Sequence, residues 1–271
     1  MEGHQSIVIA VFSTSSGIGK TITAINLAAE FAKDGYQACL VDLDLQFGDV
    51  MSYLKLSSGV TLADAQNALL RAPENFRIAD FLTEYRHEDV SFSVLPPPRD
   101  VYDAYTIKVS TIENIIYQLS GFNFIILDLP AVFSALNLAV LDLSTIINFI
   151  GVMDFLPAVK NYKIGYDTLL RFGYEEQKVR LVENRSDSQK FIRSRDVERL
   201  LGTRFYHRLP NDFPAVSKSI REGRPLMFAA PQSALTRSYW DLVGLYTGRP
   251  KSAKRPYEQK EPGAFMRFFG M

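Results

Sequence analysis

The most constraining feature of this sequence is an apolar strand pattern that leads into a short glycine-containing loop and then into a helical pattern. Ser6–Phe12 reads SIVIAVF, a run rich in β-branched residues that predicts a buried strand. The loop that follows reads STSSGIGKT. Thr21–Lys33 then carries apolar residues at helical spacing, and the turn signal Asp34-Gly35 ends it. This order predicts an α/β unit.

The same alternation continues along the chain. Further strands are predicted at Gln37–Val41, Phe92–Leu95, Asn123–Leu127, Thr145–Ile150, Val179–Val182 and Thr203–Tyr206, and helices at Ile107–Leu119, Leu156–Arg171 and Ser194–Leu201. Near-continuously apolar strands separated by helices predict a three-layer α/β fold, with a mostly parallel, twisted sheet and helices on both faces. With 271 residues, 47% of them apolar, the chain is long enough for a full core. We expect one domain over residues 1–247.

Charge and cysteine content exclude several classes. Lys plus Arg equals Asp plus Glu, at 30 each, so no global positive field favours nucleic acid, and we expect no nucleic-acid partner. The single cysteine, Cys39, lies in an apolar run and is expected to be a buried residue, which leaves no cysteine-based metal cluster. We find no signal-peptide pattern and no apolar run of membrane-spanning length, so we expect a cytoplasmic protein.

The Gly-Lys-Thr tripeptide, residues 19–21, has the composition of the end of a phosphate-binding loop. It stands between a predicted strand and a predicted helix, where unpaired N–H groups and the helix dipole favour an anion. Gly17 and Gly19 allow backbone amides to approach phosphates, Lys20 can reach the outer phosphates, and the Thr21 hydroxyl can ligate magnesium.

Three aspartates follow predicted strands and suit a magnesium–nucleotide site. Asp42 and Asp44 alternate in LVDLD, so an extended chain directs both to one face. Asp128 ends FNFIILD and suits the carboxylate that holds the magnesium shell. Any one of them could instead cap a helix. Together with the Gly-Lys-Thr loop they predict a nucleotide-binding P-loop fold.

At this point the sequence resembles the deviant Walker A ATPases of the MinD/ParA class. The stretch GIGKTITAINLAAEFAKDGYQACLVDLD follows that class from Gly17 onward. Within the class the chain is most similar to the CpaE/TadZ group of pilus-assembly ATPases, through VDLDLQFGDV (41–50), VTLADAQ (60–66), LPPP (95–98), FNFIILDLP (122–130), VENR (182–185) and LPNDFPAVSKSIREGRPL (209–226).

The resemblance implies a role for each matching residue. Lys20 and Asp44 would be catalytic, with Asp44 positioning the attacking water. Thr21, Asp42 and Asp128 would hold Mg²⁺. ATP or ADP would be bound by Ser15, Ser16, Gly17, Ile18, Gly19, Lys20, Thr21 and Ile22 around the phosphates, and by Asn184, Pro210, Asn211 and Asp212 around the adenine.

The first half of the loop departs from the class. The signature lysine lies five residues before the P-loop lysine, and this chain has Ser15 there. Thr14 and Ser16 replace glycines, and Val132 replaces a glycine after the Walker B aspartate. In the class the signature lysine reaches the partner's nucleotide across a dimer, and loss of such a charge would cost ~10²–10³ in rate. We therefore expect ATP binding, with hydrolysis slow or absent.

The C-terminus differs in composition from the domain. Residues 248–263 are polar, proline-broken and mostly basic, which predicts a flexible linker. The last eight residues, 264–271, read AFMRFFGM, where Phe265, Phe268 and Phe269 would share one face of a short helix, with Met266 at its margin. This ending resembles the membrane-targeting tail of MinD proteins, which implies binding to an anionic membrane surface. The alternative is a terminus that folds back on the body.

The resemblance implies a protein that dimerises with ATP and positions or assembles a type IV/Flp (Tad) pilus machine. It would lie on the inner face of the cell membrane, with the cell pole as a candidate location. Its partners would be the secretion ATPase and membrane platform proteins. Two alternatives stay open: a MinD-like regulator of division site or flagellar number, and a nucleotide-gated scaffold without turnover.

Overall fold

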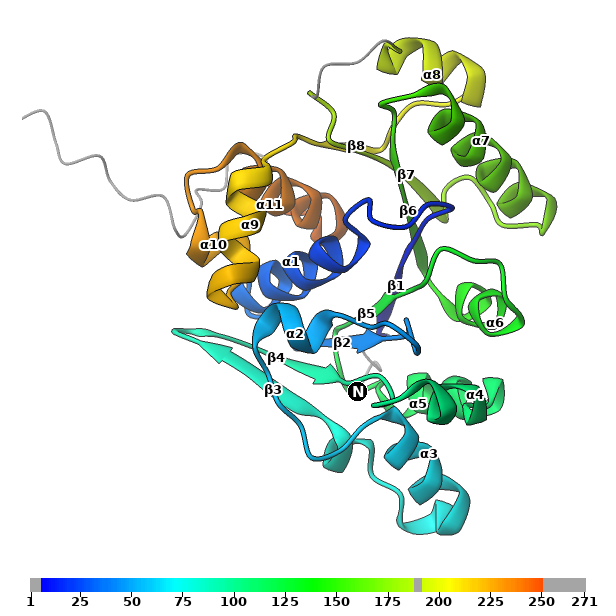
Figure 1. Cartoon of the computed structure of the whole chain (residues 1–271), viewed down its shortest axis with the longest axis vertical. Coiled ribbons are helices and arrows are strands. Elements are labelled where there is room, and N and C mark those ends of the chain that lie inside the picture. Colours follow the sequence, from blue (N-terminus) through cyan, green and yellow to red (C-terminus); the bar gives the residue numbers. More distant parts are fainter. Residues whose placement is uncertain (1–5, 188–191, 251–271) are drawn as a thin grey trace, which may run out of the picture.

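A single twisted sheet of eight strands forms the middle of the molecule (Figure 1). The computed structural model describes residues 6–187 and 192–250. The spatial order of the strands is β3-β4-β2-β5-β1-β6-β7-β8, and every neighbouring pair is parallel except β3 and β4. The strands are β1 (Ile7–Phe12), β2 (Ala38–Asp42), β3 (Thr83–His87), β4 (Val90–Leu95), β5 (Phe124–Asp128), β6 (Ile146–Val152), β7 (Val179–Asn184) and β8 (His207–Leu209).

Helices cover both faces of this sheet, as the alternating pattern predicts. One face carries α1 (Lys20–Lys33), α2 (Val50–Leu54), α9 (Phe213–Glu222), α10 (Leu226–Ala229) and α11 (Ala234–Thr247). The other carries α3 (Leu62–Arg71), α5 (Val109–Gln118), α6 (Ala135–Leu143), α7 (Leu156–Arg171) and α8 (Ser194–Leu201), with α4 (Val101–Thr106) beside α5. Two short 3₁₀ helices, Pro73–Asn75 and Ile78–Phe81, connect α3 to β3.

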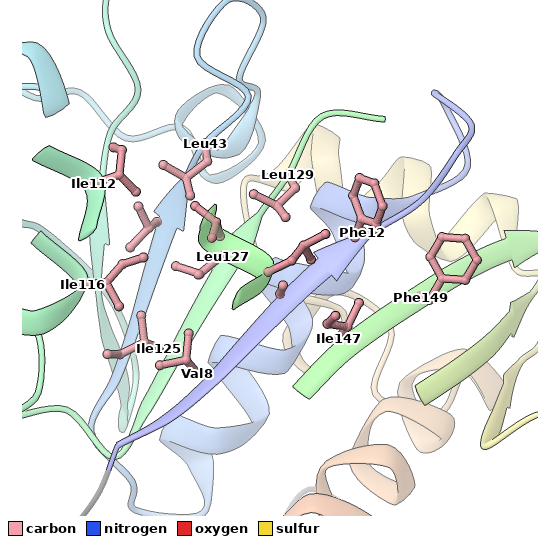
Figure 2. Packing of buried hydrophobic residues seen from close by; sticks show 14 of the residues in the cluster. Val8, Phe12, Leu43, Ile112, Ile116, Ile125, Leu127, Leu129, Ile147 and Phe149 are labelled. Carbon is pink, nitrogen blue, oxygen red and sulfur yellow. The ribbon is translucent and has the colours of Figure 1, made fainter. Parts of the chain in front are cut away.

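The central strands bury both of their faces, so the protein has two apolar cores. Along β1, Val8 and Phe12 point into the core on the α5–α7 side, whereas Ile9 and Val11 point into the core beneath α1. Figure 2 shows the first of these cores, where Phe12 lies near Phe149. Burial on both faces explains why these strands read as unbroken apolar runs.

The last strand begins directly after the predicted segment. Thr203–Tyr206 was expected to be a strand from its β-branched and aromatic residues, but this prediction is wrong, because it forms the connection from α8. The ladder with β7 begins where Val182 faces His207, and it is only three residues long. Propensity favours an extended chain but does not determine where that chain meets its neighbour.

The C-terminal predictions fall outside the described residues. Helix α11 ends at Thr247, with Gly248 in the left-handed conformation after it. Most of the predicted linker, residues 251–263, lies outside the described residues. So does the predicted tail with Phe265, Met266, Phe268 and Phe269, and both stay predictions. Within residues 6–187 and 192–250, no helix is both long and apolar enough to cross a bilayer.

Candidate functional site: a phosphate loop beside paired carboxylates

The loop between β1 and α1 has the backbone of an anion site. Gly17 and Gly19 have φ values of 69° and 96°, in the left-handed region that glycine adopts without strain. Helix α1 begins at Lys20, directly after Gly19, and no side chain of the described residues caps it. The N–H groups of its first turn are therefore available to a ligand, and the helix dipole favours a negative charge there.

Two of the predicted aspartates meet at the carboxyl edge of the sheet. Asp42 ends β2 and Asp128 ends β5, and the two residues are register partners in the parallel pair. Both are buried, and their strands alternate so that both carboxyl groups lie on the α1 side, where Leu40 and Ile126 also point. The sequence places each of these aspartates at the end of a predicted strand, and the structure ends β2 and β5 at them.

Asp128 is the carboxyl group that contacts the Thr21 side chain. Burial raises its pKa to about 7, an effect that a hydrogen bond from the Thr21 side chain and the charge of Lys20 oppose. Its Oδ1 is buried and has no hydrogen-bond partner within the described part of the chain. A buried carboxylate oxygen without a partner, next to a threonine hydroxyl, fits a hydrated Mg²⁺ ion.

Asp42 is held in place by the loop that follows β2. Its Oδ1 accepts from the Asp44 amide at 3.1 Å, and its Oδ2 accepts from the Val50 amide at 3.2 Å. Gly48 lies so close that an added Cβ would be 2.5 Å from Oδ2 of Asp42. Burial first, and then the charge of Asp128, raises the pKa of Asp42 well above its usual value. The alternation of aspartates in the sequence identified Asp42, but it gave no indication that Gly48 leaves room for the Asp42 carboxylate.

Lys20 is buried among these acids. Burial lowers the pKa of its ammonium group, while the charges of Asp128 and Asp44 act in the opposite direction. Asp44 itself is half-buried beyond the end of β2, and its Oδ1 accepts from the Phe47 amide at 3.4 Å. Among the described residues, no three His, Cys, Asp or Glu side chains form a metal cage.

The predicted adenine residues lie on the other side of the loop. A cavity of about 70 Å³ is lined by Gly19, Ile22, Asn184, Arg185, Pro210, Asn211, Asp212, Phe213, Val216, Leu235 and Tyr239. Asp212 has a structural task here, because it caps α9 by accepting from the Ala215 amide at 3.0 Å and also accepts from the Ser233 hydroxyl at 2.6 Å. Sequence reasoning did not single out Phe213, although it lies in the motif at residues 209–226, or Tyr239, which lies in none of the motifs.

Two consecutive residues at the end of β7 hold the phosphate loop. Asn184 donates from Nδ2 to the Ile18 carbonyl at 2.6 Å, and Arg185 donates from Nη2 to the Gly17 carbonyl at 3.0 Å. Arg185 has a φ of 54°, a region that few non-glycine residues adopt. Asn184 therefore braces the loop directly, in addition to lining the cavity. Sequence reasoning did not identify Arg185, although the adjacent Asn184 was singled out.

Comparison with known proteins decides which family has this arrangement. The family model of the CobQ/CobB/MinD/ParA nucleotide binding domain (CbiA) matches residues 9–226, a range that contains the loop of residues 15–22, Asp42, Asp128 and Asn184 and ends before α11. The chain belongs to this family. Membership in this nucleotide-binding family agrees with the resemblance to MinD/ParA proteins that the sequence motifs indicate.

Individual relatives are distant. The chain is 25% identical over 182 residues to the septum site-determining protein MinD of Thermotoga maritima, which covers 66% of this chain and 64% of that protein. It is 34% identical over 61 residues to the tyrosine-protein kinase CpsD of Streptococcus pneumoniae, covering 22% and 27% of the two chains. The chain thus spans less than two thirds of the length of these curated relatives.

Solved structures share the fold over nearly their whole length. A ParA family ATPase from Chlorobium tepidum superposes with a TM-score of 0.78 at 22% identity, covering 88% of this chain and 98% of that one. The MinD protein of Pyrococcus horikoshii, solved as a complex with Mg-ADP, has a TM-score of 0.75 at 19% identity, covering 89% and 96%. At these identities the likeness establishes the fold, which is the one predicted from the sequence.

Within this MinD/ParA-like fold, Ser16 lines a cavity other than the small one, whereas Ser15 lines neither. The Ser15 amide donates to the Ser13 hydroxyl at 2.9 Å, which gives the first half of the loop a local turn. A second cavity, of about 400 Å³, is lined there by Ser16, residues 43–47, Ala104, residues 130–132, Ser134, Leu136 and Asn137. Two of the residues that differ from the class pattern, Ser16 and Val132, therefore border the same cavity as Asp44.

Proposed function

We propose that this member of the family binds ATP with Mg²⁺ at the loop of residues 15–22. The observation that carries the proposal is the position of Lys20, Thr21 and Asp128: a buried ammonium, a hydroxyl and a buried carboxylate with one unpartnered oxygen. Thr21 and Asp128, with Asp42 behind them, would hold the metal ion, and Lys20 would neutralise the outer phosphates. When bound, Mg²⁺ supplies charge neutralisation at the phosphates.

We further propose that turnover is slow. Asp44 borders the open cavity beside Ser16, a position from which it could orient a water molecule. Ser15 provides a short neutral side chain where the class has a lysine, so no positive charge from this position would stabilise the developing negative charge on phosphate. This combination favours the nucleotide-gated scaffold as the second candidate function, because binding can persist where catalysis is lost.

Exposed apolar side chains support dimerisation over the nucleotide site. They lie on the loops, or at the first helical residue, that follow four different strands at the carboxyl edge of the sheet: Phe47 after β2, Val132 after β5, Phe155 and Leu156 after β6, and Phe213 after β8. Phe47 and Phe213 are each 73% exposed. So many large apolar groups around one site suit a face that a second copy covers.

In the cell, we propose a role of the CpaE/TadZ kind: a homodimer at the inner face of the cell membrane that helps to position or assemble a Tad pilus machine. The secretion ATPase and the membrane platform proteins would be its partners, and residues 264–271 its membrane contact. The division-site or flagellar regulator is the alternative, since it would use the same site and tail. Neighbouring genes for a pilin and a secretion ATPase would favour the pilus role.

Calorimetry with Mg-ATP and Mg-ADP tests the core of the proposal. Lys20→Ala should abolish binding, whereas Lys160→Ala, an exposed lysine on α7, should leave it unchanged. Phosphate release then separates a slow enzyme from a scaffold, and sedimentation velocity with ATP reports the dimer. Wild-type protein that binds neither nucleotide would overturn the proposal.

The tail has its own test. Deletion of Ala264–Met271 should abolish ATP-dependent sedimentation with liposomes that contain phosphatidylglycerol, because two tails in one dimer raise the avidity of a weak anchor. Unchanged sedimentation of the truncated protein would exclude the tail as the membrane contact.

A further inference from the structure

Positive charge is concentrated in one segment of a chain whose total charge is zero. Residues 193–208 contain five arginines and two carboxylates: Arg193, Arg195, Arg199, Arg204 and Arg208 against Asp196 and Glu198. This segment forms α8, the connection after it and most of β8, at the end of the sheet beyond β7 (Figure 1). Neither the phosphate loop nor the paired carboxylates use any of these residues.

The arginines line a groove. A cavity of about 950 Å³ lies between α8 and residues 202–208. A second cavity, of about 640 Å³, shares Thr203–Tyr206 with the first and continues to the start of β7. A third, of about 430 Å³, shares Arg195, Arg199 and Arg208 with the first and reaches the start of α8. We call this surface the arginine groove, defined by Arg180, Arg195, Arg199, Arg204, Phe205 and Arg208.

Two of these guanidinium groups are fixed by the protein. Arg208 donates from Nε to the buried Glu183 at 3.0 Å and from Nη2 to Glu198 at 2.7 Å. Arg180 lies over the ring of Tyr206, at 4.6 Å from its centre. Such contacts hold a planar donor group in one orientation, which lowers the entropy cost of recognising a carboxylate.

Two others are exposed and uncompensated. Arg195 and Arg204 have no carboxylate partner among the described residues, and both side chains are exposed. Arg199, by contrast, shares Asp196 with Arg193. Glu183 and Glu198 offset the charge of Arg208. The unpaired cations of the groove, Arg195 and Arg204, are therefore its electrostatic complement to an acidic ligand.

We propose that the arginine groove binds an acidic segment of a partner protein as an extended chain. The groove is concave, so a flat membrane surface would not reach its floor. Glu176 and Glu198 line it together with the arginines and would repel a continuous phosphate backbone, but they can accept from peptide N–H groups. The rings of Phe205 and Tyr206 offer apolar contact between the charges, which suits a peptide that mixes acidic and apolar side chains.

Fluorescence anisotropy with a fluorescein-labelled 12-residue peptide of Glu, Asp and Leu tests this assignment. The full-length protein should bind it, with affinity that falls as salt rises. Arg195→Glu with Arg204→Glu should weaken binding at least tenfold. Arg71→Glu with Arg221→Glu makes the same change in charge at exposed positions on α3 and α9 and should keep wild-type affinity. Circular dichroism melting checks that both double variants are folded.

Any of the following results would overturn the proposal. Absence of peptide binding, or equal affinity of the two double variants, would exclude the groove. A peptide with Gln and Asn in place of the acids that binds as tightly would exclude charge recognition. The same assay is run with a single-stranded oligonucleotide and with phosphatidylglycerol vesicles. If the protein binds either one more tightly than the peptide, and Arg195→Glu with Arg204→Glu weakens that binding, the groove is assigned to that ligand instead.

Discussion

Asp42 and Asp128 are register partners at the ends of adjacent parallel strands, with both carboxyl groups buried on the same side of the sheet. Burial raises the pKa of each, and the charge of Asp128 raises the pKa of Asp42 further. Only one buried ammonium, that of Lys20, lies near them in the described part of the structure. The site therefore has an excess of acid groups, and a divalent cation would relieve it.

The stability of the nucleotide-free protein should depend on pH through Asp128. Its pKa rises from the ordinary 3.8 to about 7 on folding, so the folded state binds the proton more tightly than the unfolded state does. The free energy of unfolding therefore falls as pH rises from about 4 to about 7, by an amount on the order of 1–4 kcal/mol. Asp128→Asn should remove this part of the dependence, as measured by urea unfolding between pH 4.5 and pH 8.

The exposed Glu113 on α5 provides the control. Glu113→Gln should keep the wild-type pH profile of unfolding. Parallel profiles for Asp128→Asn and wild-type protein would contradict the assignment of a raised pKa to Asp128. Affinity for Mg-ATP should change in the opposite direction, rising with pH through about 7, because the proton competes with the metal ion.

Gly48→Ala should disturb Asp42 without changing any group that touches the nucleotide. The new Cβ would lie 2.5 Å from Oδ2 of Asp42, so the carboxylate or the loop must move. We expect a loss of about 1–3 kcal/mol in the free energy of unfolding and weaker Mg-ATP binding. Gly59→Ala, where the added Cβ meets open space, should change neither quantity. Wild-type stability of Gly48→Ala would show that the loop yields easily.

The sequence predicted the central fold because its strands are buried on both faces. Such strands give unbroken apolar runs, and α7 was predicted with its observed bounds, Leu156–Arg171. The edge strand β3 escaped notice because it is half exposed and reads TEYRH. Helices of four to six residues, such as α2 and α10, are too short to display a helical period.

The site was predictable to the extent that its residues are local in sequence or follow a strand. Gly17 to Thr21 form one short loop, and Asp128 follows from the rule that carboxyl ends of parallel strands meet at one edge. Gly48 and Arg185 matter through contacts with other parts of the fold. Gly48 lies against the Asp42 carboxylate, and Arg185 donates to the Gly17 carbonyl. No spacing in the sequence encodes those contacts.

Asn184→Ala should loosen the phosphate loop. The side chain is buried and donates to the Ile18 carbonyl at 2.6 Å, so its removal leaves a buried carbonyl without this donor. We expect a loss of about 1–3 kcal/mol in the free energy of unfolding and weaker ATP binding by calorimetry. Asn67→Ala, at an exposed position on α3, should leave both unchanged. If Asn184→Ala binds ATP with wild-type affinity, the hydrogen bond to the Ile18 carbonyl is not required for nucleotide binding.

Ser15→Lys should increase turnover if the resemblance to the MinD/ParA class, which has a lysine at this position, identifies the limiting group correctly. A lysine at this position would supply a charge to the phosphates, and one such group is worth ~10²–10³ in rate. Because the class uses this lysine across a dimer, the rate per protomer should also rise with protein concentration. Phosphate release at saturating Mg-ATP measures the effect.

Two variants decide what a change in rate means. Ser57→Lys places the same charge on an exposed residue outside the loop and should keep the wild-type rate. Ser15→Ala removes the hydroxyl and tests whether the serine itself contributes to phosphate binding. If Ser15→Lys binds ATP and dimerises but releases phosphate no faster than wild type, the lysine is not the limiting element. The altered loop at Val132 would then be the next position to restore, because it borders the same cavity as Asp44.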